Sequence, residues 1–289
     1  MKIVQQIDEV RENVFKARKR GQTIGFVPTM GFLHKGHLSL VEISKQHCDY
    51  QVMSIFVNRL QFNDKNDFES YPKDLERDCR LADGIGVDLM FIPNEDEMYK
   101  ENLTHVDVTM LSENLCGASR PGHFRGVFTV VSKLFNIVLP DISVFGQKDI
   151  QQAVSIEKMV LDLNFPVRII IAPIIREDDG LAMSSRNKHL SEVERKNALS
   201  IYRSMKMAEK LIKSGEYRCI KITDAMKGLI EMGNPKMIDY ISIVNYYNLQ
   251  PVEKITGKSI IAIAAYFGTT RLIDNMIIDA SKRGFKCAY

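Results

Sequence analysis

The first half of the chain alternates short apolar runs with longer stretches in which apolar residues recur at helical spacing. The apolar runs predict β-strands at residues 23–27, 51–57, 88–92, 142–145 and 167–171. Helical spacing occupies the segments between them, at residues 38–48, 72–83, 127–138 and 150–163. Strands that alternate with helices in this way are typical of α/β proteins with a parallel sheet.

The pattern changes after about residue 187. Residues 191–213 predict one long helix, with Ser191 as its N-cap and Glu194 completing a capping box. A second helix is predicted at residues 221–231, and strands follow at residues 237–244, 259–265 and 271–278. Strands grouped after helices predict a separate α+β domain. We therefore predict an α/β domain with a parallel sheet over residues 1–187. A smaller α+β domain with an antiparallel sheet is predicted over residues 188–289.

Composition narrows the class of protein. The chain has 289 residues, 45% of them apolar and 26% charged, with a net charge of +3, which does not indicate a nucleic-acid or membrane-surface partner. Apolar runs are too short to span a membrane, and the first residues turn polar at once, unlike a signal peptide. The five cysteines are scattered without a CxxC pair, which favours reduced thiols. These features predict a cytoplasmic protein without nucleic-acid or membrane partners.

The most informative segment, residues 27–40, follows the first predicted strand and runs into a helix. Gly31 and Gly36 allow the backbone to turn tightly and to approach a ligand closely. His34 and His37 are three residues apart, so they share one face of the helix start. A helix N-terminus favours anions, and two imidazoles there can hold a polyphosphate. The segment therefore predicts a nucleotide site.

Other interpretations of the two histidines remain open. They could bind a metal ion, although no third ligand of suitable spacing lies near them in the sequence. They could also form a surface pair without a role, which fits poorly with His-x-Gly-His between a strand and a helix. The pattern by itself indicates a nucleotidyltransferase superfamily and leaves the substrate open.

Three further segments carry polar groups at the ends of predicted elements. Asn58 and Gln61 follow the second strand and are amides that can bind a carboxylate or a hydroxyl group. Lys148 follows a glycine at the end of the fourth strand, where an ammonium can meet a phosphate. Residues 183–187 combine hydroxyls with Arg186 at the predicted domain junction, where a clamp on a triphosphate could close. Considered by itself, Gln61 could be only a turn residue without a binding role. Lys148 could likewise be a solvated surface charge.

The segment at residues 27–40 resembles the His-x-Gly-His signature of class I aminoacyl-tRNA synthetases and related nucleotidyltransferases. Its flanks resemble the pantothenate synthetase (pantoate–β-alanine ligase) family. Further blocks in that family's order lie at residues 56–62, 120–127, 145–152, 176–187 and 270–275. The resemblance covers nearly the whole chain. It implies that residues 1–187 form a Rossmann-like domain that binds the nucleotide and pantoate, and that the domain of residues 188–289 closes over the active site.

The resemblance implies an ATP-dependent condensation of pantoate with β-alanine through a pantoyl adenylate, with Mg²⁺ as cofactor and a homodimer as the assembly. It implies catalytic roles for His34, His37 and Lys148. It places ATP-binding roles on Met30, Gly36, His37, Gly146, Lys148, Asp149, Met183, Ser184, Ser185 and Arg186. It places pantoate-binding roles on Asn58, Gln61 and Gln152. We assign no metal-ligating residue and no general base for the amine.

Three residues depart from the family's pattern. Lys35 replaces an acidic residue between the histidines, Arg59 replaces a proline, and Gln147 replaces a glutamate before the lysine. None of them carries a predicted chemical role.

Other functional classes fit the sequence less well than this ligase family. A cytidylyltransferase would not need the predicted pantoate-binding amides, and a tRNA synthetase would carry a basic or anticodon-binding extension. A P-loop at residues 257–259 lacks the upstream glycine and precedes a strand. A non-catalytic nucleotide sensor on the same fold remains possible, and pyrophosphate release would exclude it.

Overall fold

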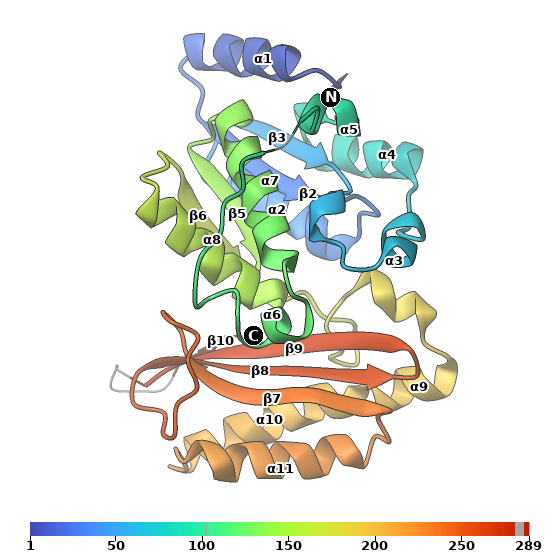
Figure 1. The fold of residues 1–289 in the computed structure, drawn as a ribbon, viewed down its shortest axis with the longest axis vertical. Coiled ribbons are helices and arrows are strands. Elements are labelled where there is room, and N and C mark those ends of the chain that lie inside the picture. The colour runs from blue at the N-terminus through green and yellow to red at the C-terminus, as the bar shows by residue number, and fades with distance from the viewer. Residues whose placement is uncertain (102, 281–285, 289) are drawn as a thin grey trace. The chain divides into compact units, whose positions relative to one another are not determined.

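A computed structural model describes residues 1–101, 103–280 and 286–288, and it contains two compact units (Figure 1). The first unit comprises Met1–Ser112, Ser119–Gly146 and Ser155–Ala172. The second comprises Glu113–Ala118, Gln147–Val154 and the chain from Pro173 onward. The boundary predicted after residue 187 thus lies inside the second unit, because residues 173–187 pack with it.

The first unit is built on a six-stranded sheet in the order β1-β4-β3-β2-β5-β6. Every neighbouring pair in it is parallel, as the sequence predicted. The strands are β1 (Lys2–Val4), β2 (Ile24–Thr29), β3 (Tyr50–Ile55), β4 (Leu89–Phe91), β5 (Ile142–Gly146) and β6 (Arg168–Ala172). Of these six strands, only β1 was not predicted; it is a three-residue strand at the edge of the sheet.

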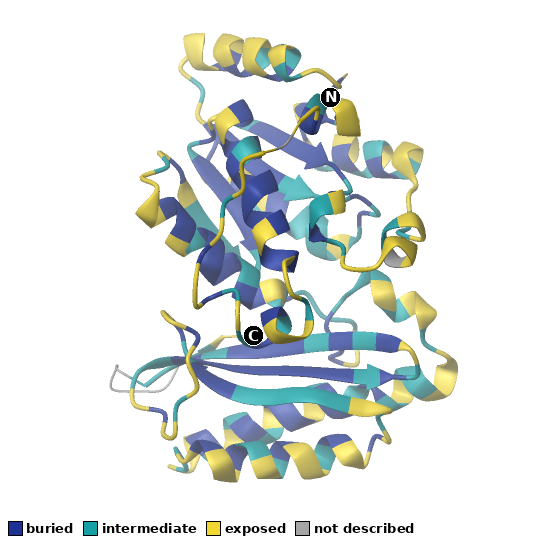
Figure 2. Ribbon diagram, viewed as in Figure 1, coloured by how far each residue is buried: buried dark blue, intermediate teal, exposed yellow. Residues whose placement is uncertain are grey.

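Helices cover both faces of this sheet, and the strands between them are largely buried (Figure 2). Successive residues of β2 show the two faces: the Phe26 ring meets Phe135 edge-on at 6.5 Å, while Val27 packs in a core that includes Leu40 and Ala82. The helices of this unit are α1 (Ile7–Lys19), α2 (Lys35–Lys45), α3 (Lys65–Glu69), α4 (Leu75–Ile85), α5 (Glu95–Met98) and α7 (His123–Val138). Two more, α6 (Cys116–Ser119) and α8 (Ile150–Asp162), cross between the two units along the chain.

The strand order fixes where this unit can bind a ligand. β2 has β3 on one side and β5 on the other, so the chain moves outward in opposite directions from the β2–β5 pair. In open α/β sheets, ligands bind outside the carboxyl ends of the strands at such a switch point. The loop after β2 carries the histidines, and β5 ends at Gly146.

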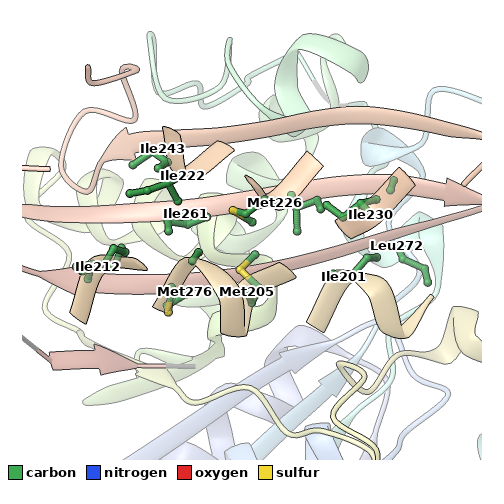
Figure 3. Close-up of a cluster of buried hydrophobic side chains, with 14 of the residues drawn as sticks. Ile201, Met205, Ile212, Ile222, Met226, Ile230, Ile243, Ile261, Leu272 and Met276 are labelled. Carbon is green, nitrogen blue, oxygen red and sulfur yellow. The ribbon is translucent and has the colours of Figure 1, made fainter. Parts of the chain in front are cut away.

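The second unit contains a four-stranded antiparallel sheet in the order β10-β9-β8-β7. Its strands are β7 (Met237–Asn245), β8 (Lys258–Phe267), β9 (Thr270–Asp279) and β10 (Lys286–Ala288). Helices α10 (Leu199–Lys213) and α11 (Cys219–Glu231) bury Met205 and Met226 against Ile261 and Met276 of the sheet (Figure 3). The predicted α+β architecture is therefore confirmed.

The single helix predicted for residues 191–213 is wrong in one respect. The capping box of Ser191 and Glu194 is present, but the segment divides into α9 (Glu192–Asn197) and α10. Ala198 separates them while keeping helical dihedrals, with φ −59° and ψ −21°. Apolar spacing does not detect such a break, because the side chains keep their helical positions. Among the described helices, none is both long and apolar enough to cross a membrane.

Candidate active site

Two histidines in the segment that joins β2 to α2 cap the N-terminus of α2. His34 is the N-cap, and its Nδ1 accepts a hydrogen bond from the Gly36 N–H at 3.1 Å. In return, the Nδ1 of His37 accepts from the His34 N–H at 3.3 Å. With Nδ1 as acceptor, a neutral imidazole carries its proton on Nε2. Both rings, whose centroids are 4.1 Å apart, therefore carry their proton on Nε2, which makes this nitrogen the donor of each ring.

Glycine at position 36 is required by this cap. A Cβ there would lie 2.9 Å from both Nδ1 and Cε1 of the His34 ring. The preceding turn also needs unusual backbone geometry, since Gly31 has φ +86° and Phe32 has φ +51°. The sequence prediction that Gly31 and Gly36 shape the loop is consistent with both features.

Asp78 of α4 holds this loop, and the sequence analysis missed it. Its carboxylate accepts hydrogen bonds from the N–H of Phe32 at 2.6 Å and from that of Leu33 at 2.7 Å. Asp78 is 1% exposed, and the Arg77 guanidinium lies 3.7 Å from it. The available signal was an acidic residue four positions before the buried Ala82, on the inward face of a predicted helix.

Asn58, Gln61 and Met30 are brought together beside this loop. A short 3₁₀ turn, η1 (Arg59–Gln61), follows β3 and is capped by Asn58. The Asn58 amide donates to Gln61 Oε1 and to the Gly126 carbonyl, both at 3.0 Å, and accepts from the Tyr99 hydroxyl at 2.9 Å. Gln61 Nε2 lies 3.0 Å from Met30 Sδ. Both donors of Asn58 are thus used within the protein, and they orient Gln61.

His123 supports the same turn from α7. Arginine can only donate, so the 3.2 Å contact from Arg120 Nη1 makes the His123 Nε2 an acceptor. The proton of His123 then sits on Nδ1, which donates to the Gln61 carbonyl at 2.7 Å. Gly126 allows the close approach of α7, since a Cβ there would lie 2.2 Å from the Leu60 carbonyl oxygen. Burial raises the pKa of Tyr99, so its hydroxyl remains a donor to Asn58.

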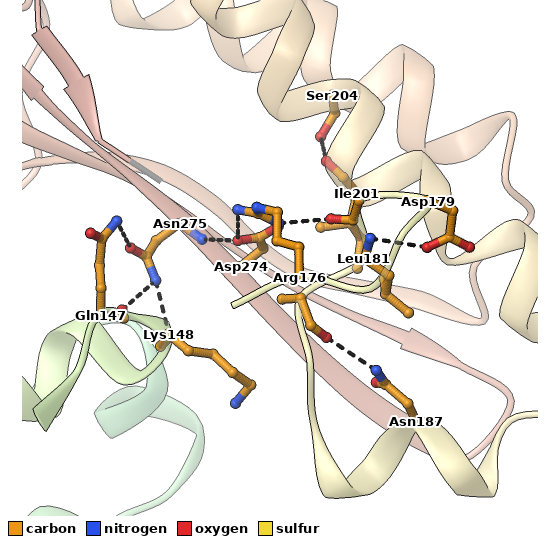
Figure 4. Close-up of polar contacts among 12 residues, drawn as sticks. Gln147, Lys148, Arg176, Asp179, Leu181, Asn187, Ile201, Ser204, Asp274 and Asn275 are labelled. Atoms are coloured by element: carbon orange, nitrogen blue, oxygen red, sulfur yellow. Dashed lines mark hydrogen bonds and ion pairs between the residues drawn. The ribbon is translucent and has the colours of Figure 1, made fainter. Parts of the chain in front are cut away.

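In the second unit, Lys148 and Asp149 lie in the 3₁₀ turn η2 (Gln147–Asp149). Lys148 Nζ is 3.4 Å from Asp149 Oδ2. The buried Asn275 of β9 donates to the carbonyls of Gln147 and Lys148 at 2.9 and 3.0 Å (Figure 4). This contact fixes the backbone from which the lysine projects.

Met183, Ser184, Ser185 and Arg186 follow a hairpin in which Arg176 pairs with Ala182. Ser184 caps the 3₁₀ helix η3 (Ser185–His189) by accepting from the Arg186 N–H at 3.3 Å. The hairpin is anchored where Arg176 meets Asp274 in a two-point ion pair at 2.8 and 3.0 Å.

Gln152 lies in the first turn of α8 and is half-buried. Its neighbour Gln151 is buried and holds the chain elsewhere in the second unit, accepting from the Cys116 N–H and donating to the Asn114 carbonyl. The predicted site residues are divided between the two units. Those in the first unit are Met30, His34, Gly36, His37, Asn58, Gln61 and Gly146. Those in the second unit are Lys148, Asp149, Gln152, Met183, Ser184, Ser185 and Arg186.

The three residues that depart from the family's pattern lie in different environments. Lys35 is exposed at the first position of α2. Arg59 forms an exposed ion pair with Glu95. Gln147 is buried, and its Nε2 donates to Asn275 Oδ1 at 3.2 Å, which an ionised glutamate would not do.

Comparison with known proteins gives consistent matches over nearly the whole chain. The sequence profile described as pantoate-beta-alanine ligase matches residues 2–277. The pantothenate synthetase of Moorella thermoacetica is 52% identical over 282 residues, which cover 97% of this chain and 100% of the relative. That of Desulfitobacterium hafniense is 53% identical over 280 residues, covering 96% of this chain and 99% of the relative.

Solved structures agree with the sequence matches. The pantothenate synthetase of Thermus thermophilus has a TM-score of 0.90 and 40% identity, covering 95% of this chain and 98% of that one. The pantoate-beta-alanine ligase of Francisella tularensis, solved with β,γ-ATP and β-alanine, has a TM-score of 0.76 and 34% identity. That match covers 95% of this chain and 97% of the other.

Proposed function

The chain belongs to the pantoate–β-alanine ligase family, and we propose that its histidine loop, its amide turn and its cationic segments divide that family's reaction between them. The chain is an enzyme that condenses pantoate with β-alanine at the expense of ATP. The pantoate carboxylate attacks the α-phosphorus of ATP and releases pyrophosphate. The amine of β-alanine then attacks the acyl carbon of the adenylate, giving pantothenate and AMP.

The reciprocal cap of His34 and His37 carries this assignment. Both rings are held with Nε2–H as a donor at the N-terminus of α2, beside the switch point of the sheet. Negative charge that develops on the phosphates during adenylation is stabilised by donors already in place. We assign this task to the two histidines, and Gly36 permits it by leaving space for the His34 ring.

Pantoate is assigned to Gln61, with Gln152 as a second amide. Three hydrogen bonds hold the turn of Gln61 in place. Asn58 donates to the Gln61 side chain, and His123 donates to the Gln61 carbonyl oxygen. Tyr99 donates to Asn58, which caps the turn. A preorganised amide binds a carboxylate or hydroxyl group without first losing conformational freedom. Asn58 would then act on pantoate chiefly by orienting Gln61, and Met30 lines the same place.

The remaining groups are assigned to ATP. Lys148 and Arg186 supply cations for the phosphates, while Ser184 and Ser185 supply hydroxyl donors. Gly146, Asp149 and Met183 are assigned to the adenosine. Among the described residues, no group of three or more His, Cys, Asp or Glu side chains is arranged to hold a metal ion. Independently of this, we propose from the resemblance to the family that Mg²⁺ is a cofactor and enters with ATP, bound in large part by the phosphates.

The location and the oligomeric state complete the proposal. We propose a cytoplasmic homodimer, which rests on the resemblance to the family. Sedimentation equilibrium would test the dimer, and a single species of 33.0 kDa would overturn it.

Pyrophosphate release provides the direct test. Purified protein is mixed with Mg-ATP and pantoate, and pyrophosphate is measured; β-alanine is then added and AMP is measured. We expect pyrophosphate to require pantoate and AMP to require both substrates. CTP in place of ATP is the control for a cytidylyltransferase. Nucleotide binding without pyrophosphate release would support a sensor and would contradict the proposal.

A further inference from the structure

Two adjacent residues of β9, Asp274 and Asn275, are both about 2% exposed and both contact segments outside the sheet. The Asn275 amide donates to two consecutive carbonyls, those of Gln147 and Lys148, at 2.9 and 3.0 Å. Its Oδ1 accepts from Gln147 Nε2 at 3.2 Å. The side chain of Asn275 thus makes three hydrogen bonds with the turn that carries Lys148 (Figure 4).

Asp274 acts on a different segment. Its carboxylate forms the two-point ion pair with Arg176, whose Nη1 also donates to the Gly180 carbonyl at 2.9 Å. The hairpin in which Arg176 pairs with Ala182 leads directly to Met183 and Arg186. Asp274 Oδ1 also accepts from the backbone N–H of Asn275 at 2.8 Å, so a hydrogen bond links the two residues. We call the contacts of Asn275 with the Lys148 turn and those of Asp274 with Arg176 the two clamps.

We propose that Asp274 and Asn275 are positioning residues for the triphosphate of ATP, with Asn275 fixing the turn of Lys148 and Asp274 fixing the hairpin that leads to Arg186. This inference rests on the proposed function, because it takes Lys148 and Arg186 as phosphate ligands. Lysine and arginine side chains are long and flexible, so their reach is defined only if their backbone is held. One strand would then orient both cations.

A purely structural role makes different predictions. Buried polar groups are normally hydrogen-bonded, so these bonds could serve stability alone. In that case, any loss of activity would follow the loss of stability and would affect both substrates alike. A positioning role affects the use of ATP selectively, because pantoate is assigned to Gln61 and Gln152.

The test compares Asn275→Asp and Asp274→Asn with Met276→Ala. Aspartate at 275 keeps the shape but presents oxygen to two carbonyls, and asparagine at 274 removes the charge opposite Arg176. Met276 is fully buried on the same strand and packs in the hydrophobic core, so its truncation destabilises the unit without touching either clamp. The readouts are Tm, the kcat and the KM for ATP and for pantoate in pyrophosphate release, and amide hydrogen exchange without substrate.

We expect Asn275→Asp and Asp274→Asn to reduce kcat/KM for ATP by about 10²-fold, with the KM for pantoate unchanged. Amide exchange should quicken at residues 147–150 in the first variant and at residues 176–183 in the second. Met276→Ala should lower Tm while leaving the KM for ATP unchanged at a temperature where all proteins are folded.

Two results would overturn the inference alone. One is an active wild type together with clamp variants in which neither the amide exchange nor the kcat/KM for ATP changes. The other is a loss of activity in all three variants in proportion to their Tm. A wild type that releases no pyrophosphate would instead remove the proposed function, and faster exchange would still demonstrate the clamps.

Discussion

His37 combines a structural and a chemical task on opposite sides of one ring. Its Nδ1 accepts the His34 N–H, and its Nε2–H is assigned to ATP. Replacement by alanine should reduce adenylation by about 10²–10³-fold. It should also cost about 1 kcal/mol of stability, because the cap loses an acceptor. Rates of pyrophosphate release and thermal unfolding measure the two effects.

Asparagine at position 37 separates these tasks. Its Oδ1 can replace Nδ1 as the acceptor for the His34 N–H, but it has no donor at the place of Nε2. His37→Asn should therefore recover most of the stability and little of the rate. A His37→Asn variant with wild-type adenylation would show that the ring has no part in the chemistry.

Asp78 acts at the same loop through the backbone. In Asp78→Asn, one of the two oxygens becomes an NH₂ group that faces an amide N–H, so one bond is lost and two donors oppose each other. We expect about 1–3 kcal/mol of destabilisation and a fall in adenylation of about 10²-fold from the displaced histidines.

Asp88 offers a matched control for this variant. It also accepts a backbone N–H, that of Gln51 at 2.7 Å, but it precedes β4 and so lies at the amino edge of the sheet. Asp88→Asn should change stability without changing the rate of pyrophosphate release. Equal losses of rate in the Asp78 and Asp88 variants would contradict a local role for Asp78.

At the scale of elements, the start of α2 depends on a close approach that glycine permits. Gly36→Ala places a Cβ 2.9 Å from the His34 ring, so the ring must move and the cap must weaken. Gly84 of α4 has no neighbouring atom within 4 Å of such a Cβ. Gly84→Ala should stabilise the protein by about 0.4–1 kcal/mol and keep full activity. Gly36→Ala should lower the adenylation rate, and an unchanged rate would mean that His34 tolerates displacement.

The same elements show what the sequence could predict. Apolar periodicity predicted the parallel sheet, because its strands are short and mostly apolar, and it also predicted the long helices between them. The helix α1 was missed although Val10, Val14 and Ala17 are buried at helical spacing. That spacing is visible in the sequence, so α1 is predictable from its apolar pattern.

The missed parts of the candidate site are contacts between distant segments. Asp78 binds residues 45 and 46 positions away, and Asn275 binds carbonyls 127 and 128 positions away. Local patterns predict which residues carry chemistry, since those residues cluster in short motifs at strand ends. The side chains that hold those motifs come from other elements, and only the folded topology brings them together.

At the scale of the whole molecule, paired carboxylates make stability depend on pH. The hydrogen bond from Arg218 lowers the pKa of Glu216 from 4.5 to about 2. A lowered folded-state pKa adds stability that is fully present above about pH 4.5 and is lost as pH falls toward 2. We expect Glu216→Gln to reduce the decline of Tm with acidification, most clearly at low salt because the pair is exposed. An unchanged pH profile would show that the pair is not formed in solution.

The division into two units makes a further prediction about fragments of the chain. Residues 173–187 contribute Leu181 to the core of the second unit and Arg176 to the ion pair with Asp274. The Asp274 side chain is 1% exposed, so without Arg176 a carboxylate would be buried without its partner. Breaking a buried ion pair on one side costs about 3–5 kcal/mol. A fragment of residues 188–289 should therefore be less stable than one of residues 173–289 by at least about this amount.

Urea unfolding of the two fragments, followed by circular dichroism, measures the difference. Both fragments lack residues 113–118 and 147–154, so the comparison isolates residues 173–187. Asp274→Asn should recover part of the stability in the shorter fragment, where the charge is unpaired, and should destabilise the longer one, where it removes the partner of Arg176. Fragments of equal stability would instead place the boundary at residue 187, as the change of pattern along the sequence predicted.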